Sequence, residues 1–248
     1  MKAAGRSRAL LSCEGVSHTE AGHPVLSDLA LSVASGEIVG LIGLHGSGKS
    51  TALNVIVGSL RPNHGIVRLD GKEISSLPLW VRARRGIAYL PQGHALIGGL
   101  TVEENLLLAA RAMPNAKEAV RTVMDDLSLA SLAAVKASAL GIRERRTVEI
   151  ARVFVLEPKV VVMDEPFSGL DPAAIDFMQG TIRELASRGV GVLVAEPVGH
   201  SAVPVCDRVV ILESGRVVVE GCAEVIWNSP DVRKRFPVVS KDSSKGSD

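Results

Sequence analysis

Apolar and polar positions alternate along much of the first seventy residues, as they do in β-strands that are buried on one face. Residues 29–33 show this alternation, and residues 65–71 repeat it before ending in an Asp-Gly pair typical of a tight turn. Residues 38–42 are instead apolar throughout, as in a strand that is buried on both faces. A helix is predicted over residues 49–57. This part of the chain is therefore expected to be β-rich with one inserted helix.

The spacing of apolar residues changes to that of helices in the middle of the chain. Residues 101–104 read Thr-Val-Glu-Glu, a capping box that predicts a helix through about residue 113. Apolar residues then recur at helical spacing over residues 116–127. A further helix is predicted from about residue 143 to residue 156, where Pro158 stops it.

Strands and helices alternate after Pro158, which predicts an α/β fold with a parallel sheet covered by helices on both faces. We see no internal repeat and no linker between independent domains. Residues 1–240 are therefore expected to form one domain with a helical part at about 93–150, and the polar residues 241–248 to be a disordered tail. The strands are predicted over residues 86–90, 160–163, 190–195, 209–212 and 216–220, and the helix over 172–187.

Composition narrows the class of protein. The 28 Lys and Arg balance 27 Asp and Glu, which does not suggest a nucleic-acid-binding or polybasic membrane-surface protein. Hydrophobic residues make up 46% of the chain, yet no apolar run approaches the ~18 residues of a membrane span. The first residues lack the apolar core of a signal peptide. The 3 cysteines are widely spaced and are interpreted as reduced cytosolic thiols.

The clearest chemical signal follows the apolar run at residues 38–42. Residues 43–50 match the phosphate-loop pattern G-x-x-x-x-G-K-[ST], between a predicted strand and a predicted helix. Glycines let backbone N–H groups surround a polyphosphate, and the helix N-terminus adds its dipole. Lys49 is expected at the β- and γ-phosphates and Ser50 at Mg²⁺. The expected nucleotide-binding residues are Gly43, Leu44, His45, Gly46, Ser47, Gly48, Lys49, Ser50 and Thr51, with Asp164 from a later segment.

Two carboxylates end the apolar run at residues 160–163. In a site of this kind Asp164 is expected to hold Mg²⁺ through water. Glu165 is placed to polarise the water that attacks the γ-phosphate, as a general base or an orienting group. A strand followed by a capping aspartate would explain this segment alone, but explains it poorly once the phosphate loop is also present.

The order of four motifs resembles the ATP-binding subunit of ABC transporters over nearly the whole chain. The phosphate loop is followed by residues 89–92 (Tyr-Leu-Pro-Gln), 164–166 (Asp-Glu-Pro) and 168–171 (Ser-Gly-Leu-Asp). The resemblance implies a P-loop NTPase core of the ABC type, with an N-terminal antiparallel β subdomain and an inserted helical subdomain. It identifies Gln92 as a catalytic and metal-binding residue that couples the nucleotide to the membrane subunit, and residues 168–171 as the D-loop.

The resemblance also implies partners and a location. ATP and Mg²⁺ are the expected cofactors, and integral-membrane transporter subunits are the expected partners, without nucleic acid. Two ATP-binding subunits form a head-to-tail dimer, either of identical or of different chains, at the cytoplasmic face of the inner membrane. Segments 77–92 and 144–152 look most like the ATPase of the lipopolysaccharide export system, and the ATPases of branched-chain amino acid importers are the alternative.

Two departures from the family pattern concern catalysis. Where the family has Leu-Ser-Gly-Gly-Glu or Gln, residues 140–144 read Leu-Gly-Ile-Arg-Glu. This change removes a hydroxyl donor and the small residues that let backbone N–H groups approach a phosphate. Pro197 stands where the family has its switch histidine, and His200 does not match the motif. Proline can neither donate a side-chain hydrogen bond nor shuttle a proton.

A third departure concerns the adenine ring, on which the family usually stacks an aromatic side chain. Glu20 occupies that place here, and His18 or His23 are the alternatives.

The three departures leave two hypotheses open, an ATPase subunit of weakened activity or a nucleotide-binding regulatory module that hydrolyses little ATP. A heterodimer with an intact partner, a weakened homodimer and a decaying paralogue would each account for them.

Overall fold

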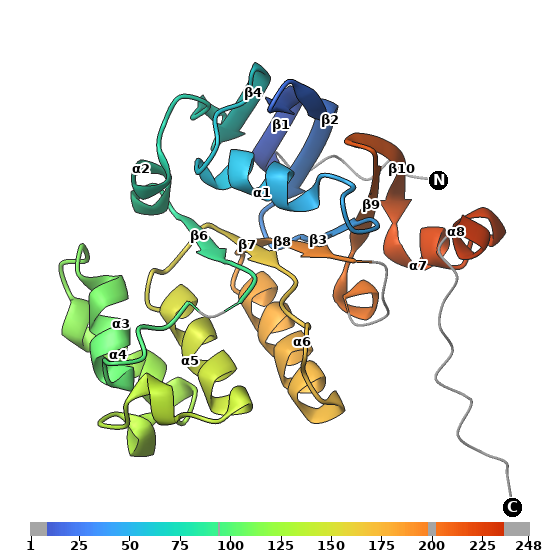
Figure 1. Ribbon diagram of the computed structural model, residues 1–248. Coiled ribbons are helices and arrows are strands. Elements are labelled where there is room, and N and C mark those ends of the chain that lie inside the picture. Colours follow the sequence, from blue (N-terminus) through green and yellow to red (C-terminus); the bar gives the residue numbers. More distant parts are fainter. Residues whose placement is uncertain (1–8, 94, 198–201, 236–248) are drawn as a thin grey trace, which may run out of the picture.

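The computed structural model describes residues 9–93, 95–197 and 202–235, and arranges them as two sheets with flanking helices (Figure 1). The smaller sheet is antiparallel, with strand order β2-β1-β4-β5. Its strands are β1 (Ala9–Glu20), β2 (His23–Ala34), β4 (His64–Leu69) and β5 (Lys72–Glu73).

The larger sheet has the order β10-β9-β3-β8-β7-β6, in which β10 is antiparallel to β9 and the other neighbours are parallel. Its strands are β3 (Ile38–Ile42), β6 (Ile87–Leu90), β7 (Val160–Asp164), β8 (Gly191–Glu196), β9 (Arg208–Glu213) and β10 (Arg216–Cys222). The helices are α1 (Lys49–Val57), α2 (Leu79–Arg84), α3 (Val102–Ala110), α4 (Ala116–Asp126), α5 (Ile142–Phe154), α6 (Pro172–Ser187), α7 (Ala223–Trp227) and α8 (Pro230–Arg235).

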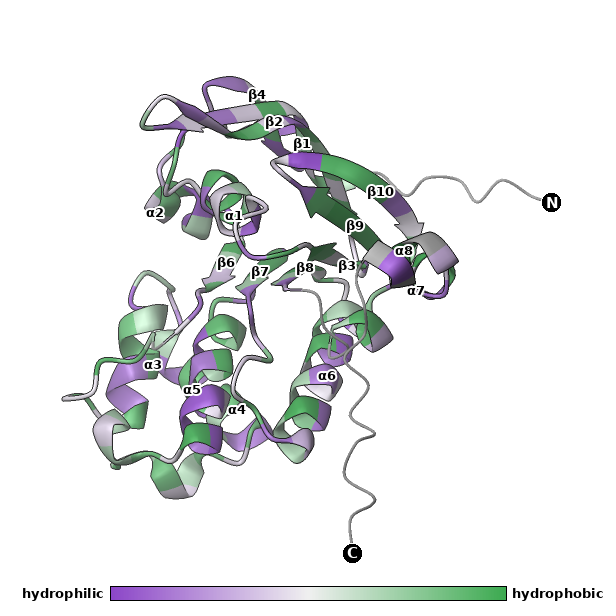
Figure 2. Cartoon of the chain, turned by 45° about the vertical axis from the view of Figure 1, so that its right-hand side comes forward, coloured by the Kyte–Doolittle hydropathy of each residue, from purple (hydrophilic) through white to green (hydrophobic). Residues whose placement is uncertain are grey.

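The parallel sheet separates two hydrophobic cores. Side chains alternate across a strand, so Val161 and Met163 of β7 pack with α3, α5 and α6, whereas Val160 and Val162 pack with α1 and the antiparallel sheet. Figure 1 shows this layering, with α1 and the antiparallel sheet on one side and α3 to α6 on the other. In Figure 2, β3 and β9 carry the hydrophobic colour of strands that are covered on both faces.

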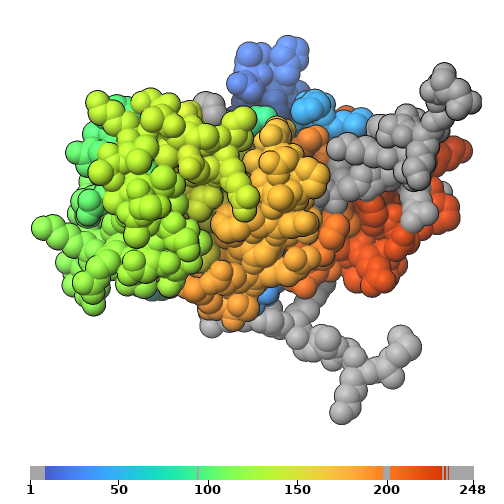
Figure 3. Space-filling model, turned by 90° about the horizontal axis from the view of Figure 1, so that it is seen from below, coloured from blue at the N-terminus to red at the C-terminus, as the bar shows by residue number. Residues whose placement is uncertain are grey.

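The helical face is formed by segments that are far apart in the sequence. Seen from below, α4 and α5 in yellow-green lie beside α6 in orange (Figure 3). Within the described part of the chain, no helix combines the length and the apolar character that crossing a bilayer requires.

The expected α/β fold with an antiparallel subdomain is confirmed. The predicted bounds are reproduced at β3, α1 and α6, and the capping box at residue 101 is present, with Thr101 and Glu104 exchanging hydrogen bonds of 2.8 and 3.2 Å. The helix that begins there ends at Ala110, not at about residue 113, because the chain turns ahead of Pro114. The predicted disordered tail, residues 241–248, lies outside the described residues.

Helix α2, which the periodicity did not predict, holds a fully buried arginine. The Arg82 side chain is 0% exposed and donates hydrogen bonds to the carbonyl oxygens of Leu77 (2.8 Å), Val55 (2.7 Å), Ile56 (2.7 Å) and Ser75 (2.9 Å). Val55 and Ile56 belong to the last turn of α1, where carbonyl groups lack helical partners and a cation is favourable. Burial lowers the pKa of Arg82 to about 10. This single side chain therefore joins α1 to the segment that leads into β6.

We predict that Arg82→Met destabilises the chain by roughly 3 kcal/mol or more, because it leaves several buried carbonyl groups without a donor. The urea midpoint of unfolding measures the effect. Arg84→Met is the matched control on the same helix; its guanidinium is exposed over the Trp80 ring and its loss is expected to cost less than about 1 kcal/mol. Equal midpoints for the two variants would contradict this account of Arg82.

Candidate nucleotide-binding site

The phosphate-loop segment connects the end of β3 to the start of α1. Gly46 and Gly48 have φ angles of 76° and 101°, which favour glycine. At Gly43 a Cβ atom would lie 2.3 Å from the carbonyl oxygen of Leu212 and 2.5 Å from Ser47 Oγ. Any side chain at position 43 would therefore displace the loop, whose backbone passes directly against β9.

Lys49 is buried at the centre of this loop. Its Nζ donates hydrogen bonds to the carbonyl oxygens of Gly43 (2.8 Å) and Leu44 (2.9 Å), which uses two of the three donors of an ammonium group. Burial lowers the pKa of Lys49, and the carboxyl groups of Glu165, Asp164 and Glu196 act in the opposite direction. The ammonium thus lies among several acidic groups, with a donor left for an anion.

Two buried polar atoms beside Lys49 have no hydrogen-bond partner among the described residues. They are Ser47 Oγ in the loop and Asp164 Oδ1 at the end of β7. Burial raises the pKa of Asp164, and a hydrogen bond from Ser50 acts against that rise. Unsatisfied buried polar atoms are costly and uncommon. A hydroxyl donor, a carboxylate oxygen and a glycine cradle are the groups that a magnesium–polyphosphate complex requires, so the residues fit this ligand.

Glu165 and Gln92 meet although 73 positions separate them. Gln92 Nε2 donates a hydrogen bond of 2.6 Å to Glu165 Oε2. The Glu165 amide donates to the Ala195 carbonyl oxygen at 2.9 Å, and its φ angle of 47° is uncommon for a residue other than glycine. Neighbouring strands β6 and β7 carry these two residues past the same edge of the sheet. The structure therefore brings together the two residues predicted to be catalytic.

Glu196 is a buried acid of the site to which the sequence gave no role. It ends β8, and its Oε1 accepts a hydrogen bond of 3.0 Å from the amide of Phe167, two residues after Glu165. Burial raises its pKa to about 7; the hydrogen bond from Phe167 acts against that rise, and the charge of Glu165 adds to it. An acid at the end of an all-apolar strand was the available signal, but only the strand order shows that Glu196 neighbours the phosphate loop and Glu165.

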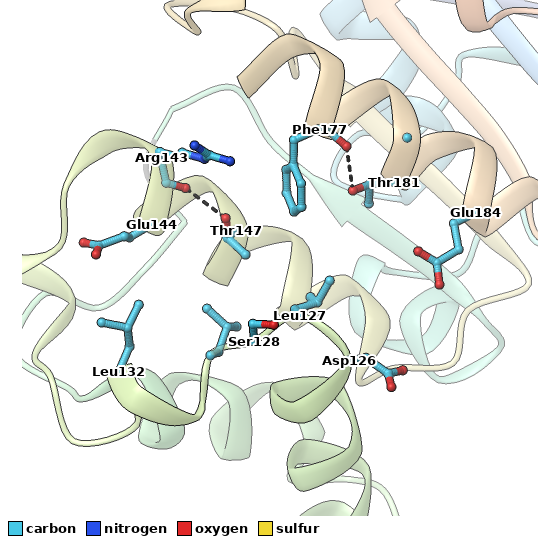
Figure 4. Close-up of a pocket in the computed structure, with 12 residues that line it drawn as sticks. Asp126, Leu127, Ser128, Leu132, Arg143, Glu144, Thr147, Phe177, Thr181 and Glu184 are labelled. Carbon is cyan, nitrogen blue, oxygen red and sulfur yellow. Dashed lines mark hydrogen bonds between the residues drawn. The ribbon is translucent and has the colours of Figure 1, made fainter. Parts of the chain in front are cut away.

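Residues 140–144 open helix α5. Gly141 is the N-cap residue, and its amide donates to Glu144 Oε2 at 2.9 Å. The Ile142 side chain is 75% exposed and lies beside Gln92 and Glu165 at a small cavity of about 220 Å³. Arg143 faces a groove of about 680 Å³ between α5 and α6 and extends toward Phe177 (Figure 4). The segment thus begins a helix, but its first turn presents bulky side chains.

The remaining predicted positions lie apart from this cluster. Glu20 and His23 pair at the end of the β1–β2 hairpin, and both are exposed. His18 donates from Nδ1 to the carbonyl oxygen of Arg61 at 3.0 Å. Asp171 caps α6 by accepting a hydrogen bond of 2.8 Å from the Ala174 amide. His200 lies outside the described residues, and the adenine contact stays a prediction.

The raised pKa of Glu196 predicts a pH-dependent stability. Between pH values of about 4.5 and 7, Glu196 binds more protons in the folded state than in the unfolded state. The contribution of Glu196 to the free energy of unfolding therefore falls as the pH rises. Glu196→Gln removes that penalty and keeps an acceptor for Phe167. The difference in free energy of unfolding between Glu196→Gln and wild type should therefore shift in favour of the variant by about 2 kcal/mol from pH 5 to pH 8.

Urea unfolding at the two pH values, without nucleotide or Mg²⁺, measures this gain. Glu103→Gln, on the exposed side of α3, is the control. Its difference from wild type in free energy of unfolding should change by less than about 0.5 kcal/mol between the two pH values. A constant difference between Glu196→Gln and wild type across this pH range would show that Glu196 titrates normally.

Comparisons with known proteins agree on one family. The family model described as ABC transporter matches residues 26–168. A probable ABC transporter ATP-binding protein of Azorhizobium caulinodans is 36% identical over 230 residues, which are 91% of this chain and 82% of that protein. The lipopolysaccharide export system ATP-binding protein LptB of Haemophilus influenzae is 34% identical over 233 residues, 92% of this chain and 97% of that protein.

Solved structures give the same result. An ATP-binding cassette of an ABC transporter in its ADP conformation aligns with a TM-score of 0.84 and 26% identity, covering 92% of this chain and 98% of that one. An ATP-binding subunit of an ABC transporter aligns with a TM-score of 0.78 and 32% identity, covering 92% and 93%. Together with the phosphate loop and the carboxylates at the end of β7, these matches show that the chain belongs to the ABC transporter family, as an ATP-binding subunit.

Proposed function

We propose that this chain binds ATP with Mg²⁺ at residues 43–51 and Asp164, and uses its hydrolysis to drive separate membrane subunits at the cytoplasmic face of the inner membrane. The observation that carries the proposal is the buried cluster at the end of β3 and β7. It combines the Lys49 ammonium with unpartnered Ser47 Oγ and Asp164 Oδ1 atoms. Members of this family bind ATP with Mg²⁺ and act with membrane subunits of transporter complexes.

Each residue of the site has a role in this proposal. Lys49 offsets the charge of the β- and γ-phosphates, and the loop amides orient them. Ser50, Asp164 and Gln92 would hold Mg²⁺, which supplies charge stabilisation to the transferring phosphoryl group. Glu165 orients the attacking water and accepts its proton. The 2.6 Å hydrogen bond from Gln92 orients the Glu165 carboxylate, which supports this role.

The substitutions in the first turn of α5 support a weakened activity. In a head-to-tail dimer this turn approaches the ATP bound by the partner. Gly141 supplies no hydroxyl, and the exposed Ile142 and Arg143 side chains obstruct the approach of backbone donors. Pro197 adds no side-chain donor. A partner with an intact signature segment would complete the site in a heterodimer; a regulatory module with little hydrolysis is the second candidate.

For the cargo we propose lipopolysaccharide or a related lipid, with branched-chain amino acids as the alternative. Relatives named for lipopolysaccharide export are 33–35% identical to this chain, which supports the first choice. Crosslinking the tagged chain to membrane proteins in its native host, followed by mass spectrometry, tests the choice. Recovery of amino acid permease subunits would contradict lipid export.

We also propose that residues 1–240 form one domain, with its helical part at about residues 93–150.

We predict that Lys49→Ala abolishes binding of ATP–Mg²⁺, because the Lys49 ammonium lies inside the phosphate loop and offsets the charge of the phosphates. Isothermal titration calorimetry measures the affinity. Lys72→Ala on the exposed strand β5 is the control and should bind as wild type does. An affinity of Lys49→Ala within about threefold of wild type, under roughly 1 kcal/mol, would mean that the loop does not hold phosphate.

We predict that Gly141→Ser, Ile142→Gly and Arg143→Gly, made together, raise ATP turnover at least tenfold, since restored donors are typically worth a few kcal/mol on a transferring phosphoryl group. Steady-state phosphate release measures turnover. Adding Glu165→Gln to the triple variant is the control and should remove the gained activity. Wild-type turnover of about 1 per second or faster would show that the native segment is not defective.

A further inference from the structure

Arg146 joins helix α5 to the turn that carries Glu165. Its Nη2 donates to the carbonyl oxygens of Pro166 (2.8 Å) and Glu165 (3.2 Å), and its Nε donates to Pro166 at 3.2 Å. These bonds go to the backbone of the turn and leave the Glu165 carboxylate free to bond Gln92. The guanidinium thus fixes the backbone from which the predicted catalytic side chain extends.

The same guanidinium continues to the loop after Gln92. Arg146 Nη1 forms an ion pair of 2.8 Å with Glu149 Oε2. Glu149 Oε1 accepts a hydrogen bond of 3.2 Å from the Ala95 amide, and Arg152 donates from Nη1 to the Ala95 carbonyl oxygen. Glu149 and Arg152, three positions apart on α5, therefore bond the amide and the carbonyl oxygen of Ala95 respectively.

These contacts form a ring beside the cavity of about 220 Å³. The ring runs from Gln92 through its loop to Ala95, then through Glu149 and Arg146 to the backbone of Glu165, whose carboxylate returns to Gln92. Four of these residues, Gln92, Arg146, Glu149 and Glu165, line the cavity. A change at any one member therefore reaches both loops.

Burial makes the ring a unit of fixed geometry. The Arg146 and Glu149 side chains are only 12% and 3% exposed. Buried charges are stable only when their hydrogen-bonding groups stay paired, and a displaced Ala95 would leave Glu149 Oε1 without its amide donor, which is costly. Displacement of the loop after Gln92 must be followed by Glu149 and Arg146, and through them by the turn at Glu165.

We propose that Arg146 and Glu149 are positioning residues for Glu165, which fix its backbone to the loop after Gln92 so that movement of this loop moves the carboxylate. The inference rests on the proposed role of Glu165 in hydrolysis. In this proposal Arg146 and Glu149 do not touch the nucleotide. They act on hydrolysis only by fixing the position of Glu165.

Amide hydrogen exchange of the full chain without nucleotide tests the linkage directly. Glu149→Gln is nearly isosteric, and the hydrogen bonds of the Glu149 carboxylate within the described residues come from Arg146 and Ala95. We expect it to speed exchange at least about fivefold in residues 165–170, where the Phe167 and Ser168 amides are hydrogen-bonded, and also in residues 95–97. Arg146→Lys, which keeps the charge but not the fork of donors, should affect the same two segments.

Arg145→Gln is the matched control on the same helix, because its side chain bonds only the Ala137 carbonyl oxygen in the described structure. It should leave exchange in residues 165–170 unchanged. If Glu149→Gln speeds exchange only in residues 95–97, the two loops are not linked and the proposal is overturned. This outcome is independent of ATP binding, which Lys49→Ala tests.

Kinetics separate positioning from a merely structural role. In single-turnover hydrolysis by the triple variant of α5, adding Arg146→Lys should lower the rate at least tenfold while the dissociation constant for ATP stays within about threefold. A loss of ATP affinity with an unchanged rate would instead assign Arg146 to binding. Equal rates and affinities with and without Arg146→Lys would also overturn the proposal.

Discussion

The structure depends on gathering several buried carboxyl groups around one lysine. The parallel register of β3, β8 and β7 brings Ile42, Glu196 and Asp164 to one edge of the sheet, directly where the glycine loop turns back over Lys49. Burial, with a smaller contribution from the charge of Glu165, raises the pKa of Glu196. Buried polar atoms of Ser47 and Asp164 have no hydrogen-bond partner within the described chain. Such an arrangement is costly in the folded chain alone and becomes favourable with a cation and a polyphosphate bound.

Helix α5 supports the turn that carries Glu165. Glu165 has an uncommon backbone angle, and Arg146 donates hydrogen bonds to the backbone of its turn from the helical side of the molecule. The same helix begins with the substituted segment at Gly141 and Ile142. In the proposed mechanism the chain therefore keeps the support for the turn of Glu165, while the first turn of α5 would present bulky side chains to a partner's nucleotide. We call the phosphate loop with Glu165 the cis half of the site, because it acts on this chain's own ATP. The first turn of α5 is the trans half, because it would act on the partner's ATP. A heterodimer subunit would carry a complete cis half and a defective trans half.

Short-range patterns were sufficient to predict much of this structure. Residues 38–57 form a strand, a glycine loop and a helix whose signals are adjacent in sequence, and the fold of the parallel sheet followed from alternation after Pro158. Helix α2 and Arg82 were missed, because arginine side chains usually reach solvent, and only the packing of α1 against α2 buries this one. The role of Glu196 was missed because it depends on strand order. The roles of the site residues remain predictions, as does the adenine contact.

The central claim, a complete cis half beside a defective trans half, is tested most directly by mixing two chains. One is wild type; the other combines Lys49→Ala with Gly141→Ser, Ile142→Gly and Arg143→Gly, so that it offers a restored signature but holds no ATP of its own. Single-turnover hydrolysis should be slow for each chain alone and rise at least tenfold in the mixture, where the wild-type phosphate loop meets the restored segment. A mixture no faster than its separate components would contradict the account.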